Sequence, residues 1–250
     1  MKIIDAHAHL IPNELGVSII KRYMVEANLA KVVLVPGGMI NPWAMANFLR
    51  GTESLQLQEA PNEFLLDFCR GNEQFLPFFQ VNPAMHDRSD VEAALERGAV
   101  GLKLNPLVDK VRFEDPELEN IFELAHEREL PVYTHILLNK SASIESLETL
   151  VKRYRRIAFI IGHMGYGTSD PMAISLAAKY DNVYLETSVG AYLTIKAAVE
   201  KAGAGKLIFG SEAPAHHPKA EWEKIELLKI SDDKKELIAS RNILRLLNME

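Results

Sequence analysis

The sequence alternates between short apolar runs typical of β-strands and longer amphipathic stretches typical of helices. Most of the apolar runs are continuous, not alternating with polar residues, as is typical of parallel strands that are covered on both faces. We therefore predict eight parallel strands, at residues 2–6, 31–35, 75–81, 99–104, 131–135, 158–162, 183–187 and 206–210.

Several of the intervening segments carry start and stop signals of helices. The amphipathic stretch at residues 90–97 ends at Gly98, a residue that commonly terminates helices. Pro116 is expected at the first helical position of another helix, with Asp115 as its N-cap. Ser143 is expected to begin a third.

Eight strands alternating with helices over 250 residues predict an α/β protein, a (β/α)8 TIM barrel. A doubly wound open sheet is the alternative, although such sheets usually have fewer strands. No repeat, low-complexity tract or Gly/Ser/Pro-rich linker divides the chain, so we expect one domain over residues 1–250. The segment at residues 36–60 is longer than one βα connection needs, and we expect a lid or rim element there.

Composition limits the classes of partner. The formal net charge of −6 argues against non-specific attraction to nucleic acid or to an anionic membrane, and no apolar stretch approaches the length of a membrane span. The N-terminus has no apolar region typical of a signal peptide, and the single cysteine, Cys69, can form no disulfide within the chain. A cytoplasmic protein that acts on a small molecule is expected, and a dimer is the expected state if it self-associates.

Metal-binding residue types collect at the predicted ends of the strands. His7 and His9 end the first strand, His135 the fifth and His163 the sixth, and Glu212 follows the eighth. In a (β/α)8 barrel the chemistry sits at these C-terminal strand ends, where the βα-loops converge. The five residues are therefore candidates for one common site.

The spacing of His7 and His9 supports a metal site. Residues two apart on a strand project to the same face, so both imidazoles can bind one ion through a ring nitrogen each. A His-x-His pair alone is a weak indication of a metal site. The four strand-end histidines and the carboxylate together make it a stronger one.

Other polar residues occupy similar positions. Lys103 and Asn105 lie at the end of the fourth strand and are candidates for binding an anionic group of the substrate. Glu186 ends the seventh strand and is a candidate for an acid that stabilises the site from behind. His216 and His217 lie in the loop after Glu212, where solvated rim positions are expected.

The order of these motifs resembles the amidohydrolase superfamily, and within it the group that includes aminocarboxymuconate semialdehyde decarboxylase and the resorcylate decarboxylases. Asp5-Ala6-His7-Ala8-His9 has the form of that family's first-strand motif. The resemblance runs nearly end to end and includes Thr134-His135 and residues 101–106 (Gly-Leu-Lys-Leu-Asn-Pro), 161–165 (Ile-Gly-His-Met-Gly), 209–214 (Phe-Gly-Ser-Glu-Ala-Pro) and 241–247 (Arg-Asn-Ile-Leu-Arg-Leu-Leu).

The resemblance implies roles for the strand-end residues. His7, His9 and His135 would bind one divalent metal ion, with zinc favoured and manganese as the alternative. His163 would polarise the substrate or shuttle a proton. The family has Gly-Ser-Asp where this chain has Gly-Ser-Glu, so Glu212 keeps the carboxylate but places it about one methylene further from the backbone. Its role as ligand or base is expected from its position.

The expected chemistry is hydrolysis of an amide, ester or lactone. A metal held by imidazoles and a carboxylate lowers the pKa of a bound water towards ~7, and Glu212 could accept the water's proton. The same site could instead protonate a carbon atom and release CO2, so a non-oxidative decarboxylase is the alternative. A barrel that has lost catalysis and only binds a ligand is the third hypothesis.

Overall fold

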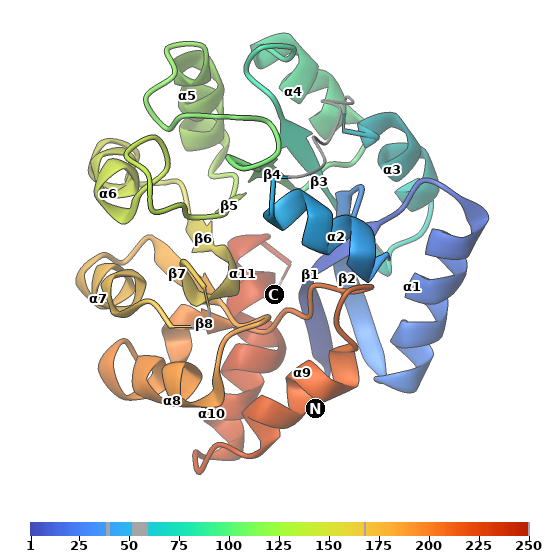
Figure 1. Ribbon diagram of the computed structural model, residues 1–250, viewed down its shortest axis with the longest axis vertical. Coiled ribbons are helices and arrows are strands. Elements are labelled where there is room, and N and C mark those ends of the chain that lie inside the picture. Colours follow the sequence, from blue (N-terminus) through green and yellow to red (C-terminus); the bar gives the residue numbers. More distant parts are fainter. Residues whose placement is uncertain (39–40, 52–59, 168, 250) are drawn as a thin grey trace.

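The computed structural model is a ring of eight parallel strands surrounded by helices (Figure 1). It describes residues 1–38, 41–51, 60–167 and 169–249. The strands pair in chain order, as the sequence predicts for a (β/α)8 barrel. They are β1 (Ile3–Leu10), β2 (Leu29–Pro36), β3 (Phe75–Val81), β4 (Gly101–Leu104), β5 (Val132–Thr134), β6 (Phe159–Ile161), β7 (Val183–Glu186) and β8 (Leu207–Ile208).

Helices connect the strands and cover the outside of the ring (Figure 1). The helices are α1 (Glu14–Glu26), α2 (Pro42–Leu49), α3 (Asn62–Cys69), α4 (Arg88–Glu96), α5 (Leu118–Arg128), α6 (Ile144–Arg153), α7 (Pro171–Lys179), α8 (Tyr192–Lys201), α9 (Pro218–Glu226), α10 (Asp232–Glu236) and α11 (Asn242–Leu246), with single turns at η1 (Gly162–Met164) and η2 (Ala204–Lys206) and a π-helical turn at η3 (Leu237–Arg241). Among the residues that the structure describes, no helix is long and apolar enough to span a bilayer.

The barrel closes where the chain leaves β8 and runs beside β1. The Ala6 N–H donates to the carbonyl of Phe209 at 2.9 Å, and the Glu212 N–H donates to the carbonyl of His7 at 2.8 Å. Regular strand structure stops at Ile208, two residues before the predicted end. The segment that follows β8 is therefore fixed directly against the residues that carry the His-x-His pair.

An extra residue in β1 decides which way the histidines point. Asp5 pairs with Val32 and Ala8 pairs with Leu34, so between these two pairs β1 advances by three residues and β2 by only two. Such a bulge shifts the alternation of side chains between the two faces of a sheet.

The effect of the bulge is visible in the neighbours of each side chain. Ala6 packs in the hydrophobic cluster inside the barrel, whereas Ala8, two residues later, packs in the outer cluster. His7 therefore turns inward, where the centre of its ring lies 4.4 Å from that of Tyr133. His9 is on the same face, and its ring centre lies 5.0 Å from that of His7. The strand extends to Leu10, beyond the predicted end at residue 6.

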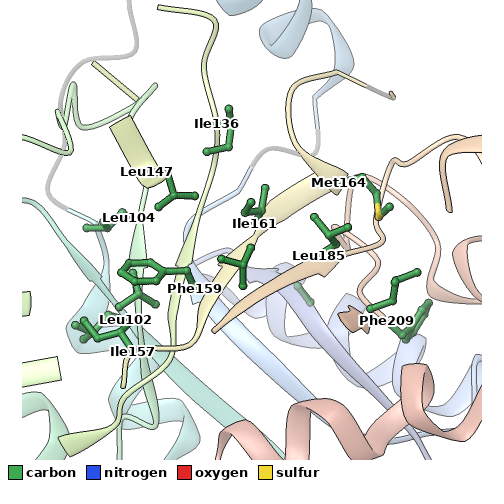
Figure 2. Close-up of a cluster of buried hydrophobic side chains, with 14 of the residues drawn as sticks. Leu102, Leu104, Ile136, Leu147, Ile157, Phe159, Ile161, Met164, Leu185 and Phe209 are labelled. Carbon is green, nitrogen blue, oxygen red and sulfur yellow. The ribbon is translucent and has the colours of Figure 1, made fainter. Parts of the chain in front are cut away.

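Hydrophobic side chains on the outer face of the strands join the barrel to its helices. Figure 2 shows this layer, in which Leu102 and Leu104 of β4 lie near Phe159 and Ile161 of β6. All four are almost completely buried, and burial of each such side chain stabilises the fold by about 1.5–3 kcal/mol. Lys103, between the two leucines, is directed to the opposite face, which is the barrel interior.

Local capping explains where several helices begin. Ser143 accepts a hydrogen bond from the Ser146 N–H at 3.2 Å and is the N-cap of α6, as predicted. The prediction for Asp115 was wrong. Its carboxylate accepts from the Arg112 N–H at 2.8 Å, which closes a turn before the helix, and α5 begins only at Leu118.

The long segment after β2 contains α2 and reaches the site through Gly38. A Cβ at Gly38 would lie 2.6 Å from the Cβ of His9, so the backbone passes directly over that imidazole. The predicted lid or rim element at residues 36–60 falls in part outside the described residues, namely at 39–40 and 52–59.

Candidate metal centre

Four imidazoles meet at the C-terminal end of the barrel. The His7 ring lies 5.0 Å from the ring of His9, 5.8 Å from that of His135 and 5.3 Å from that of His163, measured between centroids. His135 and His163 are 4.8 Å apart. The structure thus brings together the histidines that the sequence placed at the ends of three strands.

Glu212 joins this group from the segment after β8. Its Oε2 lies 3.0 Å from Nδ1 of His7, and its Oε1 lies 3.3 Å from Nε2 of His9. Each of the three residues offers a ligand atom, and these atoms lie within 4.8 Å of one another. Two imidazoles and a carboxylate at this separation match the donor set of a divalent transition metal.

Three polar atoms in this group lack hydrogen bonds. Within the described part of the chain, Nε2 of His7, Nδ1 of His9 and Oε2 of Glu212 are buried and have no hydrogen-bond partner. Leaving a buried polar atom unsatisfied costs about 1–3 kcal/mol, so a cluster of them needs an explanation. A bound cation satisfies such atoms, and the residues present therefore fit a divalent ion.

The protonation states also suit a cation. Burial lowers the pKa of His7 to about 4, although the nearby charge of Glu212 partly opposes this. Burial opposes ionisation of Glu212, but the charges and hydrogen bonding of His7 and His9 outweigh it and hold the pKa of the carboxyl well below its ordinary value. Neutral imidazole and anionic carboxylate are the forms that bind metals.

The backbone of Glu212 is held in an unusual conformation. Its φ of 63° is in the left-handed region, which costs a side-chain-bearing residue of the order of 1 kcal/mol or more. His163 has a φ of 57° and lies in the same region. Strained residues of this kind persist where the surrounding structure fixes them, and here both carry groups that point into the site.

His135 has a different partner. Its Nε2 lies 2.8 Å from Nζ of Lys103, which also lies 4.0 Å from the centre of the Tyr133 ring. Burial lowers the pKa of Lys103 to about 7, and burial together with Lys103 lowers the pKa of His135 well below its ordinary value. His135 is thus in the imidazole group, but it is not one of the residues whose ligand atoms lie together with those of His7 and Glu212.

Lys103 and Asn105 both lie inside the protein. Lys103 is fully buried, and its Nζ contacts His135. Asn105 is buried after β4, and its side-chain oxygen accepts from the Val108 N–H at 3.4 Å. That contact closes a turn after β4.

Glu186 is the acidic group behind the histidines. It is fully buried at the end of β7, with Oε2 3.4 Å from Nδ1 of His7. Burial opposes its ionisation, but the hydrogen bond and charge of His7 and the charge of His163 lower its pKa to about 2. Glu186, His7 and His163 form a second group with ligand-type atoms within 4.8 Å.

Sequence reasoning missed two residues of this region, Tyr133 and Ser188. The Tyr133 hydroxyl lies 2.7 Å from Nδ1 of His7, and the Ser188 hydroxyl lies 2.9 Å from Nδ1 of His163. Tyr133 could have been suspected because it is a polar aromatic residue within a predicted parallel strand. Ser188 carries no such indication.

The histidines of the loop after Glu212 lie at the rim. His216 pairs with Glu221 at 3.3 Å, and His217 contacts Glu26 at 2.9 Å. Both are partly exposed, in agreement with the solvated positions predicted for them.

The family model described as amidohydrolase matches residues 4–249, which is almost the whole chain. No curated protein matches the sequence of this chain.

Solved structures share the fold at low sequence identity. An uncharacterised TIM-barrel protein from Bordetella bronchiseptica has a TM-score of 0.77 at 17% identity, over 100% of this chain and 99% of that one. A 2,6-dihydroxybenzoate decarboxylase from Rhizobium has a TM-score of 0.69 at 13% identity, again over 100% and 99%. A 5-carboxyvanillate decarboxylase from Novosphingobium aromaticivorans, solved with manganese, has a TM-score of 0.69 at 14% identity, over 99% and 96%. At such low sequence identities, the structural similarity shows that these proteins share the barrel fold.

Proposed function

Because this chain belongs to the amidohydrolase family and has a cluster of metal-ligand residue types, we propose that it is a metal-dependent hydrolase of a small anionic amide, ester or lactone. The observation that supports this most directly is the unpartnered Oε2 of Glu212 beside the imidazoles of His7 and His9. A carboxylate in that position can serve a metal and a water molecule together.

The proposed ligands are His7, His9 and Glu212, with His135 as the fourth. Nε2 of His135 becomes available to the ion when Lys103 gives up its hydrogen bond to that nitrogen. Zinc suits this imidazole and carboxylate set, and manganese is supported by the manganese-bound decarboxylase of similar fold.

The chemistry divides between the ion and the protein. A divalent ion held there acts as a Lewis acid and lowers the pKa of a water molecule. Glu212 accepts the proton of the attacking water. His163, whose Nε2 lies 3.7 Å from Oε2 of Glu212, then receives that proton and, once protonated, donates a hydrogen bond to the oxygen on which charge develops.

Lys103 and Asn105 select the substrate in this proposal. The buried ammonium of Lys103 pairs with an anionic group, because an unpaired buried charge is costly and an anion offsets that cost. The amide nitrogen of Asn105, two residues further along the chain, donates a hydrogen bond to the same substrate. A small carboxylate-bearing substrate fits both groups.

Non-oxidative decarboxylation is the second candidate. The decarboxylases of similar fold support it, and the buried cation of Lys103 suits a substrate carboxylate equally well. In that reaction His163 or Glu212 would deliver a proton to carbon.

One experiment separates the two functions. Purified protein loaded with zinc or with manganese is incubated with panels of lactones and N-acyl amino acids and with hydroxybenzoates. The proposal predicts hydrolysis in the first panels and no CO2 release from the last. Release of CO2 without hydrolysis would overturn it in favour of the decarboxylase.

A further inference from the structure

We propose that Glu186 is a positioning residue that sets the tautomers of His7 and His163 together, acting through the hydroxyl groups of Tyr133 and Ser188. The inference rests on the proposed function, because it assigns those tautomers to metal binding and to proton transfer. It concerns groups that lie behind the imidazoles and touch neither the ion nor the substrate.

Glu186 is surrounded by hydrogen-bond donors. Its Oε2 accepts from the Tyr133 hydroxyl at 2.7 Å, from the Ser188 hydroxyl at 2.8 Å and from the His163 N–H at 3.2 Å. Its Oε1 accepts from the Ser188 N–H. Both oxygens thus act only as acceptors toward these groups, which is the pattern of a carboxylate.

The Tyr133 and Ser188 hydroxyl groups have one proton each, and each donates that proton in its hydrogen bond to Glu186. The Tyr133 oxygen can therefore only accept from His7, whose Nδ1 lies 2.7 Å away and must carry the ring proton. The Ser188 oxygen likewise accepts from Nδ1 of His163 at 2.9 Å. Glu186 thus reaches each histidine through one hydroxyl group, and on the His7 side Nδ1 also lies 3.4 Å from Oε2 of Glu186 and 3.0 Å from Oε2 of Glu212, which favour the same tautomer.

The tautomers that result leave Nε2 free on both rings. Nε2 of His7 is one of the buried, unpartnered atoms of the candidate metal centre among the described residues. Nε2 of His163 faces Oε2 of Glu212 at 3.7 Å. One carboxylate therefore prepares a lone pair on a proposed ligand and another on a proposed proton carrier.

Two glycines make room for this arrangement. A Cβ at Gly162 would lie 2.3 Å from the Tyr133 hydroxyl, and a Cβ at Gly210 would lie 2.3 Å from Oε1 of Glu186. Gly162 follows β6 directly and Gly210 lies two residues after β8, and each allows the polar groups to pack against the backbone. The Glu186 group is thus built into the barrel wall.

A second metal ion is the competing explanation for the group formed by Glu186, His7 and His163. The donors around Glu186 argue against it. Three donors already converge on Oε2, and an ion there would have to displace them. Positioning accounts for the same contacts without displacing any of them.

The test uses ¹⁵N spectra of the histidine rings in metal-free protein, followed by titration with manganese. In the wild-type chain both His7 and His163 are expected as Nδ1–H tautomers. Glu186→Leu removes both acceptor oxygens, so the Tyr133 and Ser188 hydroxyls can donate to Nδ1 of His7 and of His163 instead, and both tautomers should change. Manganese affinity should fall about 10- to 100-fold.

The single-link variants separate the two branches. Tyr133→Phe should alter the tautomer of His7 alone and weaken manganese binding about 10-fold or more. Ser188→Ala should alter the tautomer of His163 alone and leave manganese affinity unchanged. Tyr154→Phe, at a buried tyrosine outside the site, is the matched control and should change neither. Melting curves identify any variant that fails to fold.

The outcomes distinguish this inference from the proposed function. Wild-type protein that binds manganese with His7 as the Nε2–H tautomer would overturn the positioning role and leave the metal site standing. Equal losses of affinity in Tyr133→Phe and Ser188→Ala would also overturn it. If both tautomers are as predicted and the protein binds metal but hydrolyses none of the substrates, only the hydrolase proposal is contradicted.

Discussion

Asp5 and Ser211, 206 residues apart in the sequence, are joined by two buried hydrogen bonds that close the barrel at its site. Oδ1 of Asp5 accepts from the Ser211 N–H at 2.9 Å, and Oδ2 accepts from the Ser211 hydroxyl at 2.5 Å. Oδ1 also accepts from the His7 N–H at 3.1 Å. One carboxyl group therefore ties the strand of His7 to the segment that carries Glu212.

Removing the Ser211 hydroxyl should lower stability. Ser211→Ala leaves Oδ2 of Asp5 without that donor inside the protein, and we expect unfolding to become easier by about 1–3 kcal/mol. Urea denaturation measures the change. Ser175→Ala, at an exposed serine of α7, should change stability by less than about 0.5 kcal/mol. Equal effects of the two variants would contradict the role given to this contact.

Neutralising Glu212 should impair the site without unfolding the protein. Glu212→Gln keeps the size of the side chain but removes the charge that both metal binding and proton transfer require. Activity is expected to fall by a factor of ~10² or more. Steady-state kinetics, with metal content measured on the same sample, checks this. Unchanged activity would mean that the base lies elsewhere.

Replacing Lys103 should affect substrate binding more than metal binding. Lys103→Met keeps most of the volume but removes the ammonium group that lies 2.8 Å from Nε2 of His135. We expect KM to rise about 10- to 100-fold, since one charge-assisted contact is worth roughly 1.5–3 kcal/mol. Metal content should be retained, because the variant frees the His135 nitrogen. Loss of the metal with an unchanged KM would reverse the proposed roles.

The barrel wall should tolerate a methyl group at one glycine and not at another. Gly210→Ala places Cβ 2.3 Å from Oε1 of Glu186, so we expect a loss of about 1–3 kcal/mol in stability. Gly205→Ala meets no atom within 4 Å and is the matched control. Thermal melting of both variants decides the point, and equal melting temperatures would contradict the close packing of Glu186.

The sequence predicted the barrel well because its strands are continuous apolar runs that stand apart from the helices. The residues 75–81 of β3 were predicted with both ends correct. The bulge in β1 could not be predicted, since a spacing of two puts His7 and His9 on one face without saying which face. The sequence placed the histidines at the right end of the barrel, and the backbone shift directs them inward.

The partners of the site residues were harder to predict than their positions. Lys103 was assigned to the substrate, yet it also contacts His135, because β4 and β5 are adjacent and His135 comes two residues after Tyr133, the register partner of Lys103. Glu186 was foreseen as a supporting acid, but its links through Tyr133 and Ser188 depend on the depth of packing inside the barrel. Such contacts between inward-facing side chains have no signature in a single sequence.

The metal content of the purified protein tests the central claim most directly. Elemental analysis should find about one divalent ion per chain in the wild type, and replacement of both His7 and His9 by alanine should abolish it while the barrel stays folded. Wild-type protein that is fully stable and takes up no zinc or manganese would contradict the account. So would a double variant that keeps the same metal content.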